Sequence, residues 1–497
     1  MFESPFAYEK IAATTWAYFS SLLMLAIFFK FNRFWSVRNF DLFLIILLAP
    51  GIIMIDFGNQ VASSVSVPAP AIAPVDDSDT QADTGLLAPT IDSNDTSIEN
   101  LALKSTLQRG QKYQRIGFYW LLSMCLVFLI RSLIDPLLTR RPLLSPNLSV
   151  GGLVFLMCSL MAFLYANILS AQPTPEDLAA ARSSIKMIQR EVAQDDDTNE
   201  LKKRGPGLPL FQLFPIIPTF TNSQELMAAD VDENLNVRRY AIASKTLAIL
   251  SQSAIVLGLL LIGLIHFENV RTGFGMACIY LMLPYTAQYM GHVSHVLPGA
   301  MLVWAVVCFR RPALSGIFIG LAAGAVYYPI FLLPLWISFY WEKGVRRFIA
   351  GVLVAITICV ASLALTSSDL AHFNEQLRVT FGFWFPKMAG LDGIWGLGWD
   401  SAYRIPILVA FFALCVSFVF WPIRKNIGTL FAYTAAVMVG VQFWHGFEGG
   451  LIMAWFLPCV LMTVFRPNTE GRIAATELKE RRIAKPETVE DLIGEAA

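Results

Sequence analysis

Thirteen apolar segments, of which the eighth and ninth are short, run through this chain of 497 residues and constrain its fold more than any other feature. A helix needs about 20 mostly apolar residues to cross a bilayer, because each residue advances it by only about 1.5 Å. The sequence therefore predicts an all-α polytopic bundle of transmembrane helices with two large outer loops. The segments are 12–30, 40–57, 115–134, 149–171, 241–266, 272–288, 294–310, 313–326, 327–341, 347–366, 405–422, 428–445 and 449–465.

The composition agrees with a membrane protein and excludes several other classes. Hydrophobic residues make up 56% of the chain and charged residues only 15%, whereas soluble domains are nearer half apolar and a quarter charged. The 37 basic residues equal the 37 acidic ones, so no net charge attracts a nucleic acid. These balances exclude a soluble enzyme, a disordered protein and a nucleic-acid-binding protein. All seven cysteines lie inside apolar segments without metal-ligand spacing, so we interpret them as small buried side chains.

Basic residues beside the ends of the segments predict the orientation of the bundle, because lysine and arginine gather on the cytoplasmic side. Under the count of thirteen they fall on alternate connections. We therefore expect a multi-pass protein of the plasma (inner) membrane with its N-terminus outside and its C-terminus in the cytoplasm. The basic connections carry Lys30, Arg33 and Arg38; Arg140 and Arg141; Arg310 and Arg311; Lys343, Arg346 and Arg347; Arg424 and Lys425; and Arg466 and Arg472.

The same reasoning divides the chain into regions. The outer loop 58–112 is acidic and rich in alanine and proline, so it cannot bury enough apolar surface to fold and is predicted to be disordered. The outer loop 172–240 contains a helical stretch from Pro175 to about Val192, which we expect along the membrane surface. The other regions are two transmembrane helices in 1–57, a transmembrane pair in 113–171, a bundle in 241–465 with an aromatic outer loop at 367–404, and a cytoplasmic tail at 466–497.

Histidines supply the clearest functional candidates, because polar groups near membrane depth are costly to place. Four of the five fall on the predicted outer side. His292 and His295 are three residues apart and share a helix face. His445 and Glu448 have the same spacing at the end of another segment. Such groups suit a metal site, an acid–base cluster or an anion site, and the alternative is a structural position at the membrane interface.

Outer carboxylates and arginines form a second set of candidates. Asp56 ends the second segment, and Asp230 and Asp232 precede the fifth. A carboxylate beside a low-dielectric boundary has the shifted proton affinity that a general base needs, and a solvated flanking charge is the alternative. The neighbouring pair Arg238 and Arg239 is suited to holding a phosphate through bidentate hydrogen bonds.

Aromatic residues interleaved with glycines mark the loop 367–404. They fit either an interfacial belt or a surface that stacks on sugar rings, and the glycines indicate a loop that moves. The aromatic residues are Phe381, Phe383, Trp384, Phe385, Trp395, Trp399 and Tyr403.

Residues 273–350 carry a recognisable pattern. It runs through Met282-Leu283-Pro284-Tyr285, Gly291-His292-Val293-Ser294-His295, Leu297-Pro298-Gly299-Ala300, Arg310-Arg311-Pro312, Gly316, Gly320-Leu321-Ala322 and Tyr328-Pro329-Ile330-Phe331. It resembles the GT-C superfamily of integral-membrane glycosyltransferases, especially the polyprenyl-phosphate-sugar-dependent, mannosyltransferase-like members. Gly316 and Gly320 are expected to let helices approach closely. Tyr327-Tyr328-Pro329 is either a kink within one long helix or a tight outer turn.

Two positions depart from the family pattern. His292 and His295 stand where glutamine and asparagine are common, and Tyr327 and Tyr328 stand where a lysine precedes the proline. A tyrosine hydroxyl does not supply the charge of that lysine. The remaining candidates for phosphate binding are Arg238, Arg239, Arg378 and the histidines.

The resemblance implies a membrane glycosyltransferase that moves a sugar from a polyprenyl-phosphate donor to an acceptor at the outer face. An outer aspartate would act as the base, and cationic or histidine groups, with or without a divalent metal, would stabilise the leaving phosphate. The expected partners are the lipid-linked donor and membrane lipids, with no nucleic acid. The expected substrate contacts are His292, His295, Tyr328, Arg238, Arg239, Arg378, Trp384, Trp395, Trp399, His445 and Glu448.

Two other functions stay open. One is a catalytically degenerate relative that serves as a membrane scaffold or partner subunit. The other is a transporter or lipid flippase, which would need charged residues deep in the membrane. Arg131 and Lys245 lie near segment ends, where long side chains reach the interface.

Overall fold

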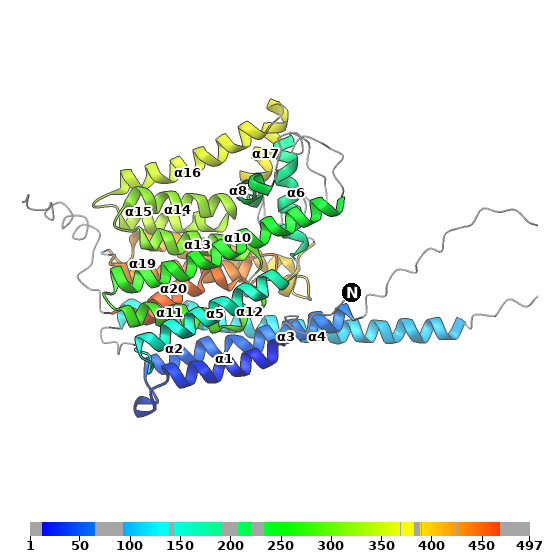
Figure 1. Ribbon diagram of the computed structural model, residues 1–497, viewed down its shortest axis with the longest axis horizontal. Coiled ribbons are helices and arrows are strands. Elements are labelled where there is room, and N and C mark those ends of the chain that lie inside the picture. The colour runs from blue at the N-terminus through cyan, green and yellow to red at the C-terminus, as the bar shows by residue number, and fades with distance from the viewer. Residues whose placement is uncertain are drawn as a thin grey trace, which may run out of the picture.

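The computed structural model describes residues 12–64, 93–138, 144–171, 173–189, 207–219, 233–289, 291–367, 369–381, 388, 390–423 and 425–467. Within these ranges the chain forms helices and no strand. Figure 1 shows most of the helices side by side along the long axis of the molecule. The all-α prediction is therefore confirmed.

The helices follow the predicted segments closely, because each predicted segment coincides with a helix or with consecutive shorter ones. The first part comprises α1 (Ala13–Phe28), α2 (Val37–Ile46), α3 (Leu48–Ser63), α4 (Ser93–Ile134), α5 (Val150–Ser170), α6 (Pro175–Gln189) and α8 (Leu208–Ile216). The second part comprises α10 (Glu233–Leu261), α11 (Val270–Met282), α12 (Pro284–Gln288), α13 (Val293–Val307), α14 (Pro312–Ala325), the 3₁₀ helix η5 (Tyr328–Leu332), α15 (Leu333–Phe339), α16 (Val345–Thr366), α17 (Leu370–Phe381), α18 (Arg404–Phe420), α19 (Ile427–Trp444), the 3₁₀ helix η8 (Met453–Trp455) and α20 (Leu457–Phe465).

Several of these helices are long and apolar enough to cross a membrane. A membrane protein with several spans is thus supported, and the count of thirteen stays a prediction because the other apolar helices are shorter. Among the described residues the seven long candidates are Val37–Ser63, Leu103–Leu137, Val150–Ser170, Asn236–His266, Val345–Thr366, Ser401–Phe420 and Ile427–Trp444.

Tyr327 and Tyr328 form a turn between two helices. α14 ends at Ala325, Val326 is extended with φ −140° and ψ 137°, and η5 then begins. The chain returns toward the start of α14, since the Tyr340 hydroxyl donates a hydrogen bond to the carbonyl of Phe309. Of the two predicted alternatives, the structure therefore contains the tight turn.

Glycines bring α14 and α16 into close contact. A Cβ on Gly316 would lie 2.2 Å from the carbonyl oxygen of Phe348, and a Cβ on Gly320 would lie 2.6 Å from the Cβ of Ala355. No larger residue fits at these distances without a shift of the helices. The close approach predicted for Gly316 and Gly320 is confirmed.

Helices extend into both ends of the loop 58–112, which we had predicted to be disordered. α3 continues to Ser63 and α4 begins at Ser93, while residues 65–92 lie outside the described part of the chain. The two helices remain in contact there, because a Cβ on Gly58 would lie 2.8 Å from the carbonyl oxygen of Gly110. The prediction for the ends of this loop was wrong, since packing between glycines outweighs the polar composition.

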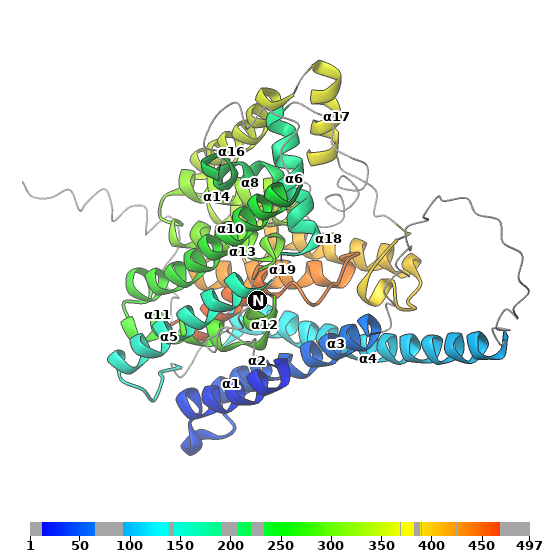
Figure 2. The ribbon, with the colours of Figure 1, turned by 45° about the vertical axis from the view of Figure 1, so that its right-hand side comes forward.

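The helix predicted to begin at Pro175 is α6. It lies across one end of the bundle (Figures 1 and 2), packed against α8 and α10. The Ser184 hydroxyl joins α6 to α8 by donating a hydrogen bond to the carbonyl of Pro209. The N-terminus of α1 and the helix α17 lie at this same end, and the turn from α15 to α16 lies at the other (Figure 1).

Four charged side chains form a buried network at the end of the bundle away from α6. Arg131 pairs with Asp41 at 2.7 Å and with Asp135 at 2.8 Å. Arg466 pairs with Asp135 at 2.6 Å, and the four side chains are 0–11% exposed. The sequence had suggested that Arg131 reaches the membrane interface. In the structure its side chain instead stays in the interior, because two carboxylates neutralise its charge there.

Candidate functional site

Stacked rings surround the histidine pair at the start of α13. The rings of His292 and His295 stack with centroids 5.0 Å apart, and the ring of Tyr289 lies 5.5 Å from that of His292. The Tyr285 hydroxyl lies 3.2 Å from Nδ1 of the buried His295. Pro284 suits the first turn of α12, since its φ is already helical; Tyr285 lies in this short helix, and Tyr289 follows it as the C-cap residue.

A carboxylate from α6 holds the start of α13. The backbone N–H of Val293 donates to Oδ1 of the buried Asp177 at 3.2 Å, and the Thr174 hydroxyl donates to its Oδ2 at 2.7 Å. A negative charge at a helix N-terminus is stabilising. Asp177 was not predicted as a site residue, although Thr174 and Asp177 have the spacing of a helix capping box.

A second cluster of rings surrounds His445, where α19 ends. The ring of Tyr328 lies 4.8 Å from that of His445 and 5.3 Å from that of Trp444. His445 is fully buried, and its Nδ1 contacts the backbone of Phe447. The turn at Tyr328 thus lies against the end of α19, which explains why these residues meet although the sequence separates them.

Trp455 joins the two clusters. Its ring packs 5.1 Å from Tyr328 and 5.7 Å from His445, while its Nε1 donates to the carbonyl of Ser294 at 3.2 Å. His295 follows Ser294 directly, so this hydrogen bond brings Trp455 to the backbone of the helical turn that carries the histidine pair, while its ring packs on His445. We refer to the rings of residues 285, 289, 292, 295, 328, 444, 445 and 455 as the histidine–aromatic cluster.

Arg404 places a buried positive charge beside this cluster, and sequence reasoning missed it. The side chain is 5% exposed, and its guanidinium donates to the carbonyl oxygen of Trp444 at 2.9 and 3.1 Å. That carbonyl belongs to the C-terminal end of α19, where a cation is stabilising. The only sequence feature that marks Arg404 is its position directly ahead of the apolar segment 405–422. Arginines are common at such boundaries, so this position did not single it out.

The aromatic loop packs against the turn that follows α19. The N–H of Asp392 donates to the carbonyl of Gly446 at 3.0 Å, and a Cβ on Gly393 would lie 2.9 Å from Cα of the half-buried Glu448. Trp395 is only 5% exposed. We had expected it to contact substrate, whereas the structure buries it in the core because the loop folds onto the bundle.

Trp399 remains partly exposed to solvent. It is 41% exposed, and its Nε1 donates to the Tyr119 hydroxyl of α4 at 2.7 Å. This bond attaches the aromatic loop to the bundle. The third predicted tryptophan, Trp384, lies outside the described residues.

The predicted base candidates are only partly described. Asp56 is half-buried on α3 and accepts a hydrogen bond from Nε2 of Gln60 at 2.9 Å. Asp230 and Asp232 lie outside the described residues. Which of these carboxylates acts as a base therefore stays a prediction.

The arginine pair lies on the first turns of α10, with Arg238 exposed and Arg239 half-buried. Consecutive side chains on a helix point in different directions. This geometry makes it difficult for both guanidinium groups to hold one phosphate, so the structure weakens that part of the prediction.

An apolar cavity of ≈ 540 Å³ lies between α14, α16 and α17. Its polar side chains are Tyr327, Asn374 and Arg378. Tyr327 is the chain neighbour of Tyr328, which belongs to the histidine–aromatic cluster, so one turn contributes a side chain to the cavity and the next side chain to the cluster. The apolar wall consists of Gly320, Ala323, Gly324, Ile330, Ile356, Val360 and Leu377.

Within the described part of the chain, the histidines are not grouped with enough other ligands for a metal site. Among the residues that the structure describes, no three His, Cys, Asp or Glu side chains come together in a group that could hold an ion. His372, the fourth histidine of the predicted outer side, lies on α17 with Nε2 3.0 Å from Nε2 of Gln376. The divalent metal that the sequence left open therefore gains no support from the described residues.

Comparison with known proteins adds no relative. No family model matches the chain, and no curated protein sequence or solved structure matches it.

Proposed function

We propose that the chain is a membrane glycosyltransferase of the GT-C type, which transfers a sugar from a polyprenyl-phosphate donor to an acceptor at the α6 end of the bundle. One observation supports the proposal: the turn at Tyr327 and Tyr328 contributes Tyr327 to an apolar cavity that Arg378 also lines, and Tyr328 to the histidine–aromatic cluster. A polyprenyl-phosphate sugar has matching parts in the same order, namely a hydrocarbon chain, a phosphate and a sugar ring.

The cavity suits the first two parts of the donor. Each buried CH₂ group contributes about 0.8 kcal/mol, so the apolar wall favours a hydrocarbon chain. Arg378 would bind the phosphate through charge-assisted hydrogen bonds, with the Tyr327 hydroxyl as a neutral donor beside it. This arrangement replaces the lysine of the family pattern with an arginine from a different helix.

The sugar would lie against the cluster. The rings of Tyr328 and Trp444 offer apolar faces, and the charge of Arg404 lies behind them. In the proposed reaction an outer carboxylate, either Asp56 or one of Asp230 and Asp232, takes the proton of the acceptor hydroxyl. The acceptor oxygen bonds to the anomeric carbon, and the bond from that carbon to the phosphate oxygen breaks. Polyprenyl phosphate leaves with the electron pair, and cations stabilise its charge.

The test measures release of polyprenyl phosphate from polyprenyl-phosphate mannose by the purified full chain. We expect Arg378→Ala to raise KM at least about tenfold, because it removes a charge-assisted contact of roughly 1.5–3 kcal/mol. The matched control is Arg271→Ala, an exposed arginine at the start of α11, which should leave KM unchanged.

Single asparagine variants at Asp56, Asp230 and Asp232 test the base. At least one of them should lower kcat by about 100-fold or more, and normal turnover in all three would refute the mechanism. A wild-type protein that binds no polyprenyl-phosphate sugar would instead support the scaffold alternative.

A further inference from the structure

A second cavity, of ≈ 830 Å³, lies at the opposite end of the α14–α16 pair. It is formed by the turn that enters α14 and the turn that enters α16. Five cationic side chains and one carboxylate line it, and we call it the basic cavity. The charged residues are Arg310, Arg311, Glu342, Lys343, Arg346 and Arg347.

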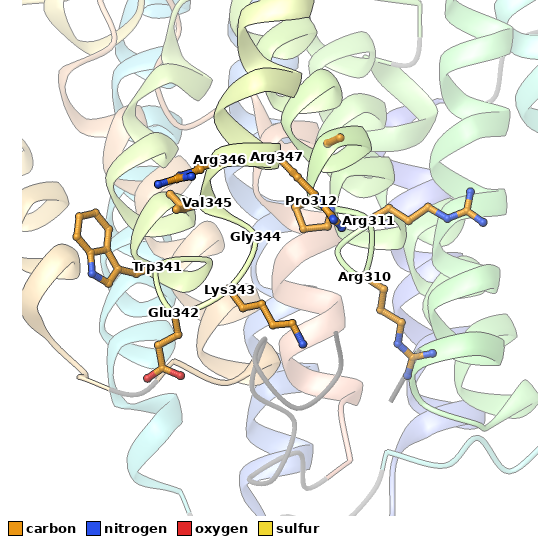
Figure 3. A pocket seen from close by; sticks show the side chains of 11 residues that line it. Arg310, Arg311, Pro312, Trp341, Glu342, Lys343, Gly344, Val345, Arg346 and Arg347 are labelled. Atoms are coloured by element: carbon orange, nitrogen blue, oxygen red, sulfur yellow. The ribbon is translucent and has the colours of Figure 1, made fainter. Parts of the chain in front are cut away.

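The cations come from both turns and from the start of α16 (Figure 3). Lys343 and Arg310 extend toward the same side of the basic cavity, and Arg347 points toward the turn that carries Arg311. Glu342 alone among the lining residues carries a negative charge. The lining residues therefore carry a positive net charge, with the side chains of Arg311 and Arg346 pointing outward on opposite sides in Figure 3.

The backbone at two helix N-termini adds to the positive charge around the basic cavity. α14 begins at Pro312 and α16 at Val345, and helix N-termini present unpaired N–H groups to anions. The start of α14 packs against the second turn of α16, because a Cβ on Gly351 would be 2.0 Å from the carbonyl oxygen of Ala313. Gly344 turns the chain into α16 with φ 103°, a conformation that favours glycine.

The position of the basic cavity indicates the source of the anion. α16 is an apolar helix long enough to cross a membrane, and the cavity lies at its first residue, at the depth where lipid headgroups would lie. Trp341 lines the cavity and is 71% exposed, and exposed tryptophan favours the interfacial layer. Basic pockets between membrane helices are suited to anionic headgroups.

We propose that the basic cavity binds the headgroup phosphate of an anionic membrane phospholipid. The lipid phosphate lies among Arg310, Lys343 and Arg347, and its acyl chains run along the apolar surface of α16. This site is separate from the proposed donor cavity, so either proposal can fail without the other.

The experiment measures lipid retention by the purified full chain in native mass spectrometry, with phosphatidylglycerol and phosphatidylcholine of identical acyl chains. Wild type should retain phosphatidylglycerol about tenfold more than phosphatidylcholine. Lys343→Ala combined with Arg347→Ala should remove this preference. The control combines Arg33→Ala with Arg271→Ala, which removes the same charge from exposed positions on other turns, and it should keep the preference.

Three results would overturn the proposal. The first is no preference for phosphatidylglycerol in wild type. The second is equal loss in the test and control variants, which would mean a diffuse electrostatic effect. The third is full displacement of the lipid by inorganic phosphate at an equal concentration, which would mean a site for free phosphate. If the double alanine variant does not fold, Lys343→Gln with Arg347→Gln is used under the same criteria.

Discussion

At the scale of single residues, Asp135 shows how this chain keeps charge in its interior. Its Oδ1 accepts from Arg131 at 2.8 Å and its Oδ2 accepts from Arg466 at 2.6 Å. Arg131 also binds both carboxylate oxygens of Asp41 at 2.7 and 2.8 Å. Two negative and two positive charges therefore balance, which is the condition under which buried ions are tolerated.

Asp135→Asn tests this balance. The substitution keeps the volume of the side chain but removes its charge, so Arg466 loses its ionic partner in a buried position. We expect a loss of about 3–5 kcal/mol of stability, measured by thermal unfolding in detergent. The control Glu375→Gln removes an exposed carboxylate from α17 and should change stability by less than about 0.5 kcal/mol. Equal melting temperatures for the two variants would contradict the buried network.

At the scale of elements, the α14–α16 pair connects the two cavities. Its glycines bring the two helices close together from Gly316, where a Cβ would meet the backbone of Phe348, to Gly324, where a Cβ would lie 2.9 Å from Sγ of Cys359. The basic cavity lies at one end of this pair and the apolar cavity at the other. The pair therefore forms part of the wall of each cavity.

Gly316→Ala tests the close spacing between α14 and α16. The new Cβ would lie 2.2 Å from a carbonyl oxygen, so the helices must separate, and we expect a loss of about 1–3 kcal/mol. Gly151→Ala on α5 is the matched control, because a Cβ there meets no atom within 4 Å. Alanine should instead stabilise α5 by about 0.4–1 kcal/mol. Thermal unfolding of both variants measures these changes in stability. An unchanged stability of Gly316→Ala would contradict the close contact between α14 and α16.

At the scale of the whole molecule, the sequence predicted what depends on local pattern. Apolar length predicted the helices, and glycine spacing predicted the close approach of Gly316 and Gly320 to a neighbouring helix. Contacts between residues far apart in the chain produce no local pattern in the sequence, so they could not be predicted. Arg466 and Asp135 are 331 residues apart, and Trp455 reaches Ser294 across 161 residues. The histidines could be selected as candidates, but the tryptophan that contacts both His445 and the backbone of Ser294 could not.

The orientation of the molecule yields a prediction that bears on both sites. Glu342 and Glu375 are exposed and lie at opposite ends of α16. If α16 crosses the membrane and the basic turns are cytoplasmic, a cysteine in Glu375→Cys should react with an impermeant maleimide on intact cells. A cysteine in Glu342→Cys should react only after permeabilisation. Wild type provides the background, since most of its native cysteines are buried.

Labelling of both variants on intact cells would mean that α16 does not span. The reverse pattern would place the proposed sugar-transfer site in the cytoplasm and the basic cavity outside, and it would separate the donor cavity from the outer face on which the proposed reaction depends.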